Sequence, residues 1–203
     1  MARTVRLPTH QVFLCDEQVR LRPFTEGDWE SVYQWFADPE VLYYSEGAES
    51  PQYTRDEIQS IYLGAAEQGA LLFIIETANG KAIGETWLQS MNLGRGLREP
   101  RDRAWRIDIM IGEKTYWGKG YGRHAVRLLL RHAFEVLEAD RVAAMRVSEF
   151  NVRSLRMFGA CGMRVVRRVS GRVTREGRRY AEVDLEITRS SWPPHPEQYI
   201  SSW

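Results

Sequence analysis

Residues 105–131 read WRIDIMIGEKTYWGKGYGRHAVRLLLR, and they hold the most informative pattern in the chain. The apolar run 105–111 is typical of a strand. From about residue 122 to 137, side chains such as Val126, Leu129 and Val136 recur at helical spacing, which predicts a long amphipathic helix. Between the two, residues 115–122 form a turn that contains glycine at every second position from 118.

This glycine turn has the chemistry of an anion site. Gly118, Gly120 and Gly122 carry no Cβ, so the backbone amides around them can converge on a phosphate. The helix that follows directs the positive end of its dipole at the same place. The spacing matches neither a Walker loop nor Gly-x-Gly-x-x-Gly. We interpret the turn as a pyrophosphate cradle, although a tight strand-to-helix connection has the same composition.

Working outward, the chain alternates between predicted helices and strands. Further strands are expected at 19–22, 71–77, 82–89, 141–147, 163–169 and 180–187, and helices at 25–36, from 38, 54–66 and 151–160. Asn79-Gly80 is a strong hairpin signal between two of the strands. Residues 43–53 and 91–103 are expected to be loops. The pattern predicts an α+β or α/β fold with a mixed sheet.

The chain of 203 residues is expected to form one domain with two extensions. Residues 1–17 are interpreted as an N-terminal extension, 18–188 as the domain, and 189–203 as a C-terminal tail that contains Pro193, Pro194 and Pro196.

Composition excludes several classes of protein. The 28 Lys and Arg residues nearly balance the 27 Asp and Glu residues, which argues against a nucleic-acid binder. Cys15 and Cys161 are too few and too far apart for a disulfide framework or a zinc cluster, so we expect no metal and a reduced, cytoplasmic setting. No apolar run approaches the ~20 residues that span a bilayer, and no signal-peptide core is visible, so no membrane partner is expected.

Several short segments together resemble one family. They are Leu21-Arg22-Pro23-Phe24-Thr25, Asp38-Pro39-Glu40-Val41, Ile83-Gly84, the turn 116–122, and Asn151-Val152-Arg153-Ser154 followed by Gly162-Met163. Through them, residues 21 to about 169 resemble the GCN5-related N-acetyltransferases (GNAT). The resemblance implies acetyl-CoA as cosubstrate. It also implies a central, mostly antiparallel sheet of six to seven strands, splayed in the middle and flanked by helices.

The resemblance also implies where the coenzyme binds. The residues carried over to the pyrophosphate are Gly118, Lys119, Gly120, Gly122 and Arg123, and Trp117 is expected to belong to the same cofactor site. Ile109, Met110 and Ile111 match the strand whose backbone binds the pantetheine, and Asn151 matches an asparagine near the same arm. Trp117 departs from the Gln or Arg that is common at this position. A tryptophan here resembles the subgroup of the family that acts on protein N-termini and some antibiotics.

Two residues are candidates for catalysis. Asp108 is a charged residue in an apolar strand, which is costly unless the charge is paired or takes part in the chemistry. As a general base, Asp108 could take a proton from the ammonium group of the acceptor. An ion pair with Arg106 is the alternative. Phe158 stands where many relatives carry a general-acid tyrosine. Ser154 matches a serine proposed for that role in ribosomal-protein N-terminal acetyltransferases, or it supports the helix start.

Aromatic and acidic residues together suggest a small polycationic acceptor. Trp35, Tyr44 and Glu46 lie near the loop after the first helices, and Glu85 and Gln89 lie in a strand; all could equally be solvated surface. Because aminoglycoside 6'-N-acetyltransferases resemble this chain in an Ile-Asp pair before the turn, we expect transfer to an aminoglycoside 6'-amine. The alternatives are a protein or peptide N-terminus, a hydroxylamine of the siderophore type, or a non-catalytic acetyl-CoA-binding module. The protein is expected to be a monomer or a homodimer.

Overall fold

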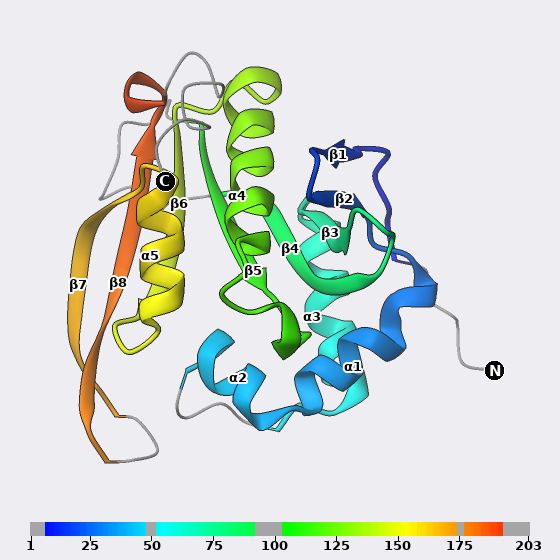
Figure 1. The fold of residues 1–203 in the computed structure, drawn as a ribbon, viewed down its shortest axis with the longest axis horizontal. Coiled ribbons are helices and arrows are strands. Elements are labelled where there is room, and N and C mark those ends of the chain that lie inside the picture. Colours follow the sequence, from blue (N-terminus) through cyan, green and yellow to red (C-terminus); the bar gives the residue numbers. More distant parts are fainter. Residues whose placement is uncertain (1–6, 48–51, 92–102, 174–176, 193–203) are drawn as a thin grey trace.

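The computed structural model describes residues 7–47, 52–91, 103–173 and 177–192. The strands form one eight-stranded sheet in the order β1-β2-β3-β4-β5-β6-β8-β7 (Figure 1). Their bounds are β1 Leu14–Cys15, β2 Val19–Pro23, β3 Leu71–Thr77, β4 Ala82–Ser90, β5 Ala104–Met110, β6 Arg141–Ser148, β7 Arg164–Val173 and β8 Arg179–Thr188. Every neighbouring pair is antiparallel except β5 and β6, which are parallel. The predicted mixed, mostly antiparallel sheet is confirmed.

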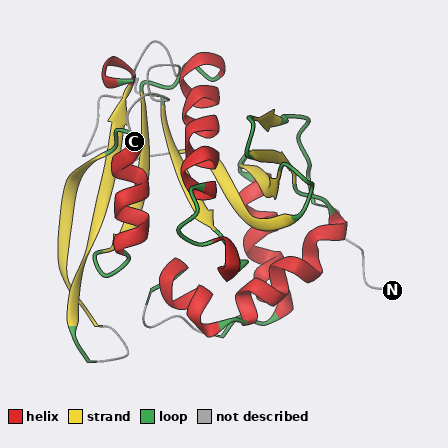
Figure 2. Ribbon diagram, viewed as in Figure 1, coloured by secondary structure: helices red, strands yellow, loops and turns green. Residues whose placement is uncertain are grey.

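The helices cover both faces of this sheet (Figure 2). Their bounds are α1 Trp29–Ala37, α2 Pro39–Ser45, α3 Arg55–Glu67, α4 Tyr121–Arg131, which continues as a π-helical turn His132–Val136, and α5 Val152–Ala160. Short 3-10 turns cover Glu26–Asp28, Lys114–Tyr116 and Arg189–Ser191. Asp38 caps α2, and Thr54 with Glu57 forms a capping box at the start of α3, so these two predicted helix starts are confirmed.

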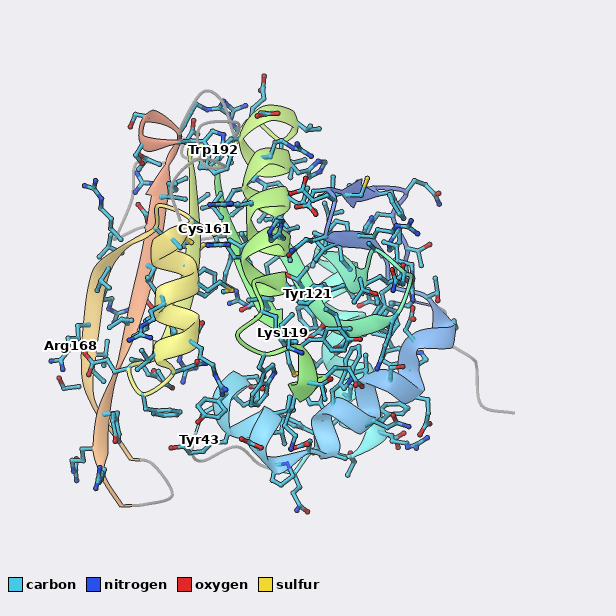
Figure 3. All side chains as sticks on the ribbon, in the orientation of Figure 1. Tyr43, Lys119, Tyr121, Cys161, Arg168 and Trp192 are labelled. Carbon is cyan, nitrogen blue, oxygen red and sulfur yellow. The ribbon has the colours of Figure 1, made fainter. Side chains whose placement is uncertain are left out.

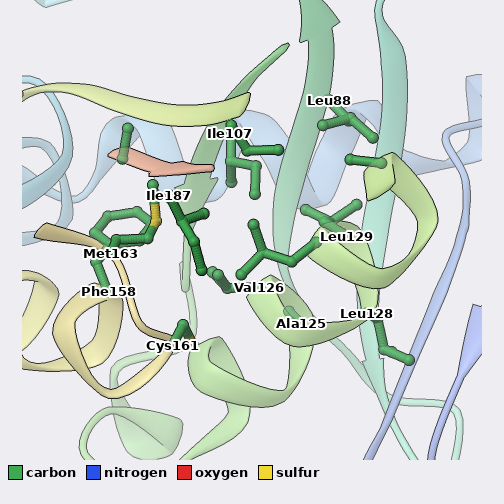
Figure 4. Packing of buried hydrophobic residues seen from close by; sticks show 14 of the residues in the cluster. Leu88, Ile107, Ala125, Val126, Leu128, Leu129, Phe158, Cys161, Met163 and Ile187 are labelled. Atoms are coloured by element: carbon green, nitrogen blue, oxygen red, sulfur yellow. The ribbon is translucent and has the colours of Figure 1, made fainter. Parts of the chain in front are cut away.

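Two apolar cores form because side chains alternate along the strands. In β3, Phe73 and Ile75 point to the core under α4 and α5, which Figure 4 shows from close by. Leu72 and Ile74 point to the other core, under α1, α2 and α3. The site described below lies where the sheet opens between these two layers.

The sheet opens between β5 and β6. The two strands pair only from Ala104, opposite Arg141, to Arg106, opposite Ala143, and then diverge (Figure 1). An irregularity in β6 accompanies the divergence: Arg146 has φ +56°, and its amide donates to the Asp184 carboxylate at 2.8 Å. The last residues of β5 therefore present one edge that no strand covers, as the expected splay requires.

The N-terminal segment adds the eighth strand, one more than we expected. β1 pairs with β2, and the Asp16 carboxylate lies 2.7 Å from Nδ1 of His124 on α4. Leu7 is buried, and Nε2 of His10 lies 3.0 Å from the carbonyl of Leu72. A two-residue strand is too short to show periodicity, which is why no sequence pattern predicted it.

Other expectations meet the structure in part. β3 and β4 form the predicted hairpin, with Gly80 at φ +80°. The expected loop from residue 43 begins later, because α2 runs to Ser45. Residues 48–51 and most of the expected loop 91–103 lie outside the described residues, as do the three prolines of the C-terminal segment. Trp192 still packs against Phe134, with ring centroids 5.4 Å apart.

Candidate active site

The glycine turn has backbone angles that other residues rarely adopt. Gly118 has φ +71° and Gly120 has φ +91°, both in the left-handed region. Gly120 is also the N-cap of α4 and has no side chain with which to cap the amides of the first helical turn. Figure 3 shows Lys119 and Tyr121 at this end of α4. The uncapped amides and the helix dipole fit an anionic ligand at this position.

Arg123 adds a further sign of an anion site. Its Nε is buried and has no hydrogen-bond partner among the described residues. A Cβ added to Gly120 would lie 3.9 Å from Nη2 of Arg123, so the guanidinium reaches back to the turn. Because a buried donor is normally paired, this geometry is what a phosphate ligand would satisfy.

Gly122 lets the two helices of the site approach each other. A Cβ at this position would lie 2.8 Å from Sδ of Met157 on α5 and 3.8 Å from Cδ1 of Ile109 on β5. The first turn of α4 is therefore packed directly against both the splayed strand and α5. Gly118 and Gly120 are thus required by the backbone conformation, and Gly122 by the close packing of the two helices.

Trp117 fixes the turn to the end of β5 through its side chain. Its Nε1 donates to the carbonyl of Ile111 at 2.6 Å, and its indole packs on the core beneath α1, α2 and α3. The hydrogen bond occupies one acceptor position of Ile111, which was expected to bind pantetheine. Ile109 and Met110 keep their backbone along the uncovered edge of β5, since the pairing with β6 stops at Arg106.

Asn151 links α5 to α2. Its Oδ1 accepts from the amide of Ser154 at 3.1 Å and caps α5, and its Nδ2 donates to the carbonyl of Tyr44 at 2.8 Å. Ser154 is half-buried in the first turn of α5. Phe158 is 2% exposed and belongs to the core, so it presents nothing to the site.

On the other side of the sheet, β4 and β5 carry an acidic surface. The register pairs Glu85 with Met110 and Trp87 with Asp108, so these four side chains share one face. Met110 and Trp87 contact the core beneath α1, α2 and α3, which identifies the face. Here the structure brings the predicted residues of both strands together.

Asp108 is held from one side. Its Oδ2 accepts from Nε of Arg106 at 2.7 Å and from Nε2 of Gln89 at 2.8 Å. Its Oδ1 accepts no hydrogen bond from the described residues, and the side chain is 40% exposed. The ion pair with Arg106 that we weighed as an alternative is therefore present, and it leaves one oxygen free to meet an acceptor. Gln89 serves to orient this carboxylate.

Glu85 is buried, at 8% exposure, and accepts a hydrogen bond from the indole of Trp87. Burial raises the pKa of Glu85 to about 8, and the negative charges of Asp108 and Glu46 add to the shift. The fully buried hydroxyl of Tyr62 lies beside this carboxyl, although it makes no hydrogen bond of normal geometry. Glu85 is consequently protonated at neutral pH unless a cation binds nearby.

Glu46 completes the acidic group from the end of α2. Glu46 is exposed at the surface, yet the protein atoms around it partly desolvate its carboxylate and raise its pKa. The negative charge of Asp108 raises this pKa further. Tyr53 donates to Glu46 at 3.4 Å. Three carboxylates, Glu46, Glu85 and Asp108, thus interact electrostatically from α2, β4 and β5.

The two aromatic residues expected to bind acceptor are placed differently from each other. Trp35 is 3% exposed and lies under Gly112, where an added Cβ would be 2.0 Å from its ring. It is a core residue that an acceptor does not reach in this structure. Tyr44 is half-buried, and its ring meets that of Trp117 at a centroid distance of 5.6 Å, so it lies at the junction with the glycine turn.

Three further residues belong to the site, and sequence reasoning passed over them. Tyr62 and Tyr53 contact the acidic group from α3 and the segment before it. Arg153 contacts both Tyr44 and Trp117. Tyr62 occupies an ordinary core position of an amphipathic helix, so no sequence signal distinguished it. Arg153 follows the helix cap Asn151 by two residues, and this proximity was the one sequence feature that could have indicated its place in the site.

The sequence matches the family described as "Acetyltransferase (GNAT) domain" over residues 18–164. An aminoglycoside N(6')-acetyltransferase type 1 from Klebsiella pneumoniae is 29% identical over 153 residues, which is 72% of this chain and 74% of that protein. An uncharacterized protein from Methanocaldococcus jannaschii is 23% identical over 150 residues, and this chain spans only 28% of its length.

Solved structures give the same fold. The aminoglycoside acetyltransferase AAC(6')-Ib in complex with coenzyme A superposes with a TM-score of 0.68 at 25% identity, over 85% of this chain and 96% of that one. A spermidine N-acetyltransferase from Vibrio cholerae, in complex with CoA and spermine, gives a TM-score of 0.72 at 20% identity, over 87% of this chain and 98% of that one. The latter likeness concerns the fold alone.

Fold and site together define an acetyltransferase with a splayed sheet and a glycine turn. This chain belongs to the GNAT family, and the expectation of an acetyl-CoA-dependent N-acetyltransferase is confirmed at the level of the family. Among the described residues, no group of His, Cys, Asp and Glu could hold a metal ion, and no helix has the length and apolarity that crossing a membrane requires.

Proposed function

We propose that this protein transfers the acetyl group of acetyl-CoA to a primary amine of a small polycationic acceptor. The best candidate is the 6'-amine of an aminoglycoside, in which case the enzyme would confer resistance to that antibiotic. We further propose that it acts in the cytoplasm, the reduced setting expected for two free cysteines.

The observation that carries the proposal is the group of three interacting carboxylates beside the open edge of β5. Burial raises the pKa of Glu46 and Glu85, and the neighbouring negative charges raise it further, so a ligand with several positive charges would favour the ionised carboxylates. An acceptor with a single ammonium group would leave part of this acidic surface unpaired. The likeness to aminoglycoside N(6')-acetyltransferase supports the same substrate class.

The donor is proposed to lie on the opposite side of the opening. The uncapped amides of α4 and the side chain of Arg123 would hold the phosphates, and the free edge of β5 would bind the pantetheine backbone. Both sites meet at β5, where Asp108 faces the acceptor. This placement brings amine and thioester together, which supplies much of the catalytic effect through orientation.

The chemistry then needs a neutral amine. We propose that Oδ1 of Asp108 takes one proton from the acceptor ammonium, after which the nitrogen forms a bond to the carbonyl carbon of the thioester. The carbon–sulfur bond then breaks with its electron pair on sulfur, and the second proton of the attacking nitrogen passes to that sulfur, so that the amide and the CoA thiol are released. Ser154 is the proposed hydrogen-bond donor to the departing sulfur. The protonated Glu85 is unsuited to the role of base, because its proton is retained at neutral pH.

The test is steady-state turnover of acetyl-CoA with kanamycin-type aminoglycosides, spermidine, and peptides that begin with Ala or Ser. We expect turnover with an aminoglycoside and a loss of about 100-fold in kcat/KM for Asp108→Asn, with CoA affinity retained. Asp56→Asn, on the exposed first turn of α3, is the matched control. Activity confined to the peptides would favour an N-terminal acetyltransferase, and CoA binding without turnover of any amine would favour a non-catalytic module.

A further inference from the structure

Arg153 occupies a corner between two aromatic rings. It lies in the first turn of α5, and its guanidinium carbon is 4.3 Å from the ring centroid of Tyr44 and 4.2 Å from that of Trp117. The two rings stand nearly perpendicular, at 85°. Such contacts hold a guanidinium in place while they leave its in-plane N–H groups able to donate.

The charge of Arg153 has no carboxylate partner among the described residues. Two arginines near the acidic group are, by contrast, paired: Arg106 binds Asp108 at 2.7 Å, and Arg146 binds Glu182 at 3.2 Å. Arg153 is exposed, so its charge is not itself costly, but two aromatic rings fix its position beside Trp117. A fixed, unpaired cation is what an anion-binding site requires.

The position of Arg153 points to phosphate. Trp117 directly precedes the glycine turn, whose amides and whose neighbour Arg123 already fit an anion. The turn and α5 are packed together through Gly122 and Met157. The geometry points to Arg153 as a ligand of a coenzyme phosphate group. The start of α4 would form one part of the phosphate site, and Arg153 would form another part from α5.

This inference rests on the proposed coenzyme site and is independent of the acceptor. The probes are CoA, 3'-dephospho-CoA and pantetheine, and the variants are Arg153→Met, which keeps most of the apolar contact, and Arg153→Lys, which keeps the charge. Arg164→Met, on the exposed strand β7, is the matched control. Affinities for the two nucleotides are measured by titration calorimetry and for pantetheine by NMR titration, with thermal unfolding as a check on folding.

We expect Arg153→Met to raise the Kd for CoA by about 10-fold or more, Arg153→Lys to recover part of the loss, and pantetheine binding to stay as in wild type. Equal weakening of CoA and 3'-dephospho-CoA would assign Arg153 to the diphosphate, and weakening of CoA alone to the 3'-phosphate.

Three results would overturn the inference. The first is an Arg153→Met variant that binds CoA at least as tightly as wild type. The second is a variant that weakens pantetheine binding as much as CoA binding, which would indicate a packing role. Failure of wild type to bind CoA would overturn the proposed function as well, so the two failures are distinguishable.

Discussion

Gly120 determines how α4 begins. With φ +91°, it turns the chain so that the uncapped amides of the helix face outward from its first turn. The nearest atom to an added Cβ is Oε1 of Gln18 at 3.8 Å, so space is available and only the backbone conformation demands glycine.

Gly120→Ala is therefore expected to lower the free energy of unfolding by about 1 kcal/mol and to weaken CoA binding severalfold. Urea denaturation and calorimetry measure the two effects. The control is Gly159→Ala in α5, where an added Cβ meets nothing within 4 Å and alanine is the better helix former. Unchanged stability of Gly120→Ala would show that the turn does not need its left-handed residue.

Glu85 gives a prediction about pH. Its folded-state pKa is raised to about 8, so the folded protein holds a proton that the unfolded chain releases above about pH 4.5. The stability that this proton contributes is complete below about pH 4.5 and is lost as the pH rises through 8.

We expect Glu85→Gln, which cannot ionise, to gain stability over wild type between pH 5 and pH 9, by on the order of 2 kcal/mol. Thermal unfolding across that range measures the gain, and Glu67→Gln at the exposed end of α3 is the control. A constant difference between Glu85→Gln and wild type over the whole range would contradict a buried, protonated carboxyl.

At the scale of elements, the start of α5 connects the two halves of the site. Asn151 caps α5 and reaches the carbonyl of Tyr44 on α2, two residues before the acceptor-side Glu46. The helix that carries Glu46 is thus held by the residue that we expect to lie near the pantetheine arm.

Asn151→Ala should remove both bonds and lower stability by about 1 kcal/mol, whereas Asn151→Ser should restore the cap but not the bond to Tyr44. We therefore expect Asn151→Ser to recover the unfolding free energy while the KM for the acceptor stays elevated. Denaturation and steady-state kinetics separate the two roles. If the serine variant recovers both, the bond to α2 has no function.

At the scale of the whole molecule, the N-terminal segment ties the sheet edge to the domain. The neutral ring of His10 donates from Nε2 to the carbonyl of Leu72, and its Nδ1 accepts from the amide of Val12 at 3.2 Å. Burial lowers the pKa of His10, and it likewise lowers that of His132, on which the charge of His10 also acts. Protonation of His10 would turn its Nδ1 into a donor that faces another donor.

Because the folded-state pKa of both histidines is lowered, the stability they contribute is present above their unfolded pKa of about 6.5 and is lost as the pH falls. We expect the segment 7–16 to loosen between pH 7 and pH 5, with roughly 1 kcal/mol of this loss absent in His10→Gln. Hydrogen exchange at the Val12 amide measures it. The same acceleration in His10→Gln as in wild type would refute the assignment.

The order of helices and strands followed from local patterns, because turn residues, caps and hydrophobic periodicity act over a few neighbouring positions. The glycine turn, the Asp38 and Thr54 caps and the Asn79-Gly80 hairpin were all visible in this way, and so was the family. Asp108 could be predicted as a candidate site residue because a charged side chain in an apolar strand is costly unless it is paired or takes part in the chemistry.

Contacts between distant segments were decided only by the tertiary structure. Trp35 and Glu85 have similar sequence surroundings to exposed site residues, yet one fills the core beneath Gly112 and the other is buried beside Tyr62 and kept protonated. The corner that holds Arg153 needs Tyr44 and Trp117, which lie far apart in the chain. The burial and the protonation state of a residue depend on which distant segments the fold places beside it. The neighbouring sequence does not determine those contacts.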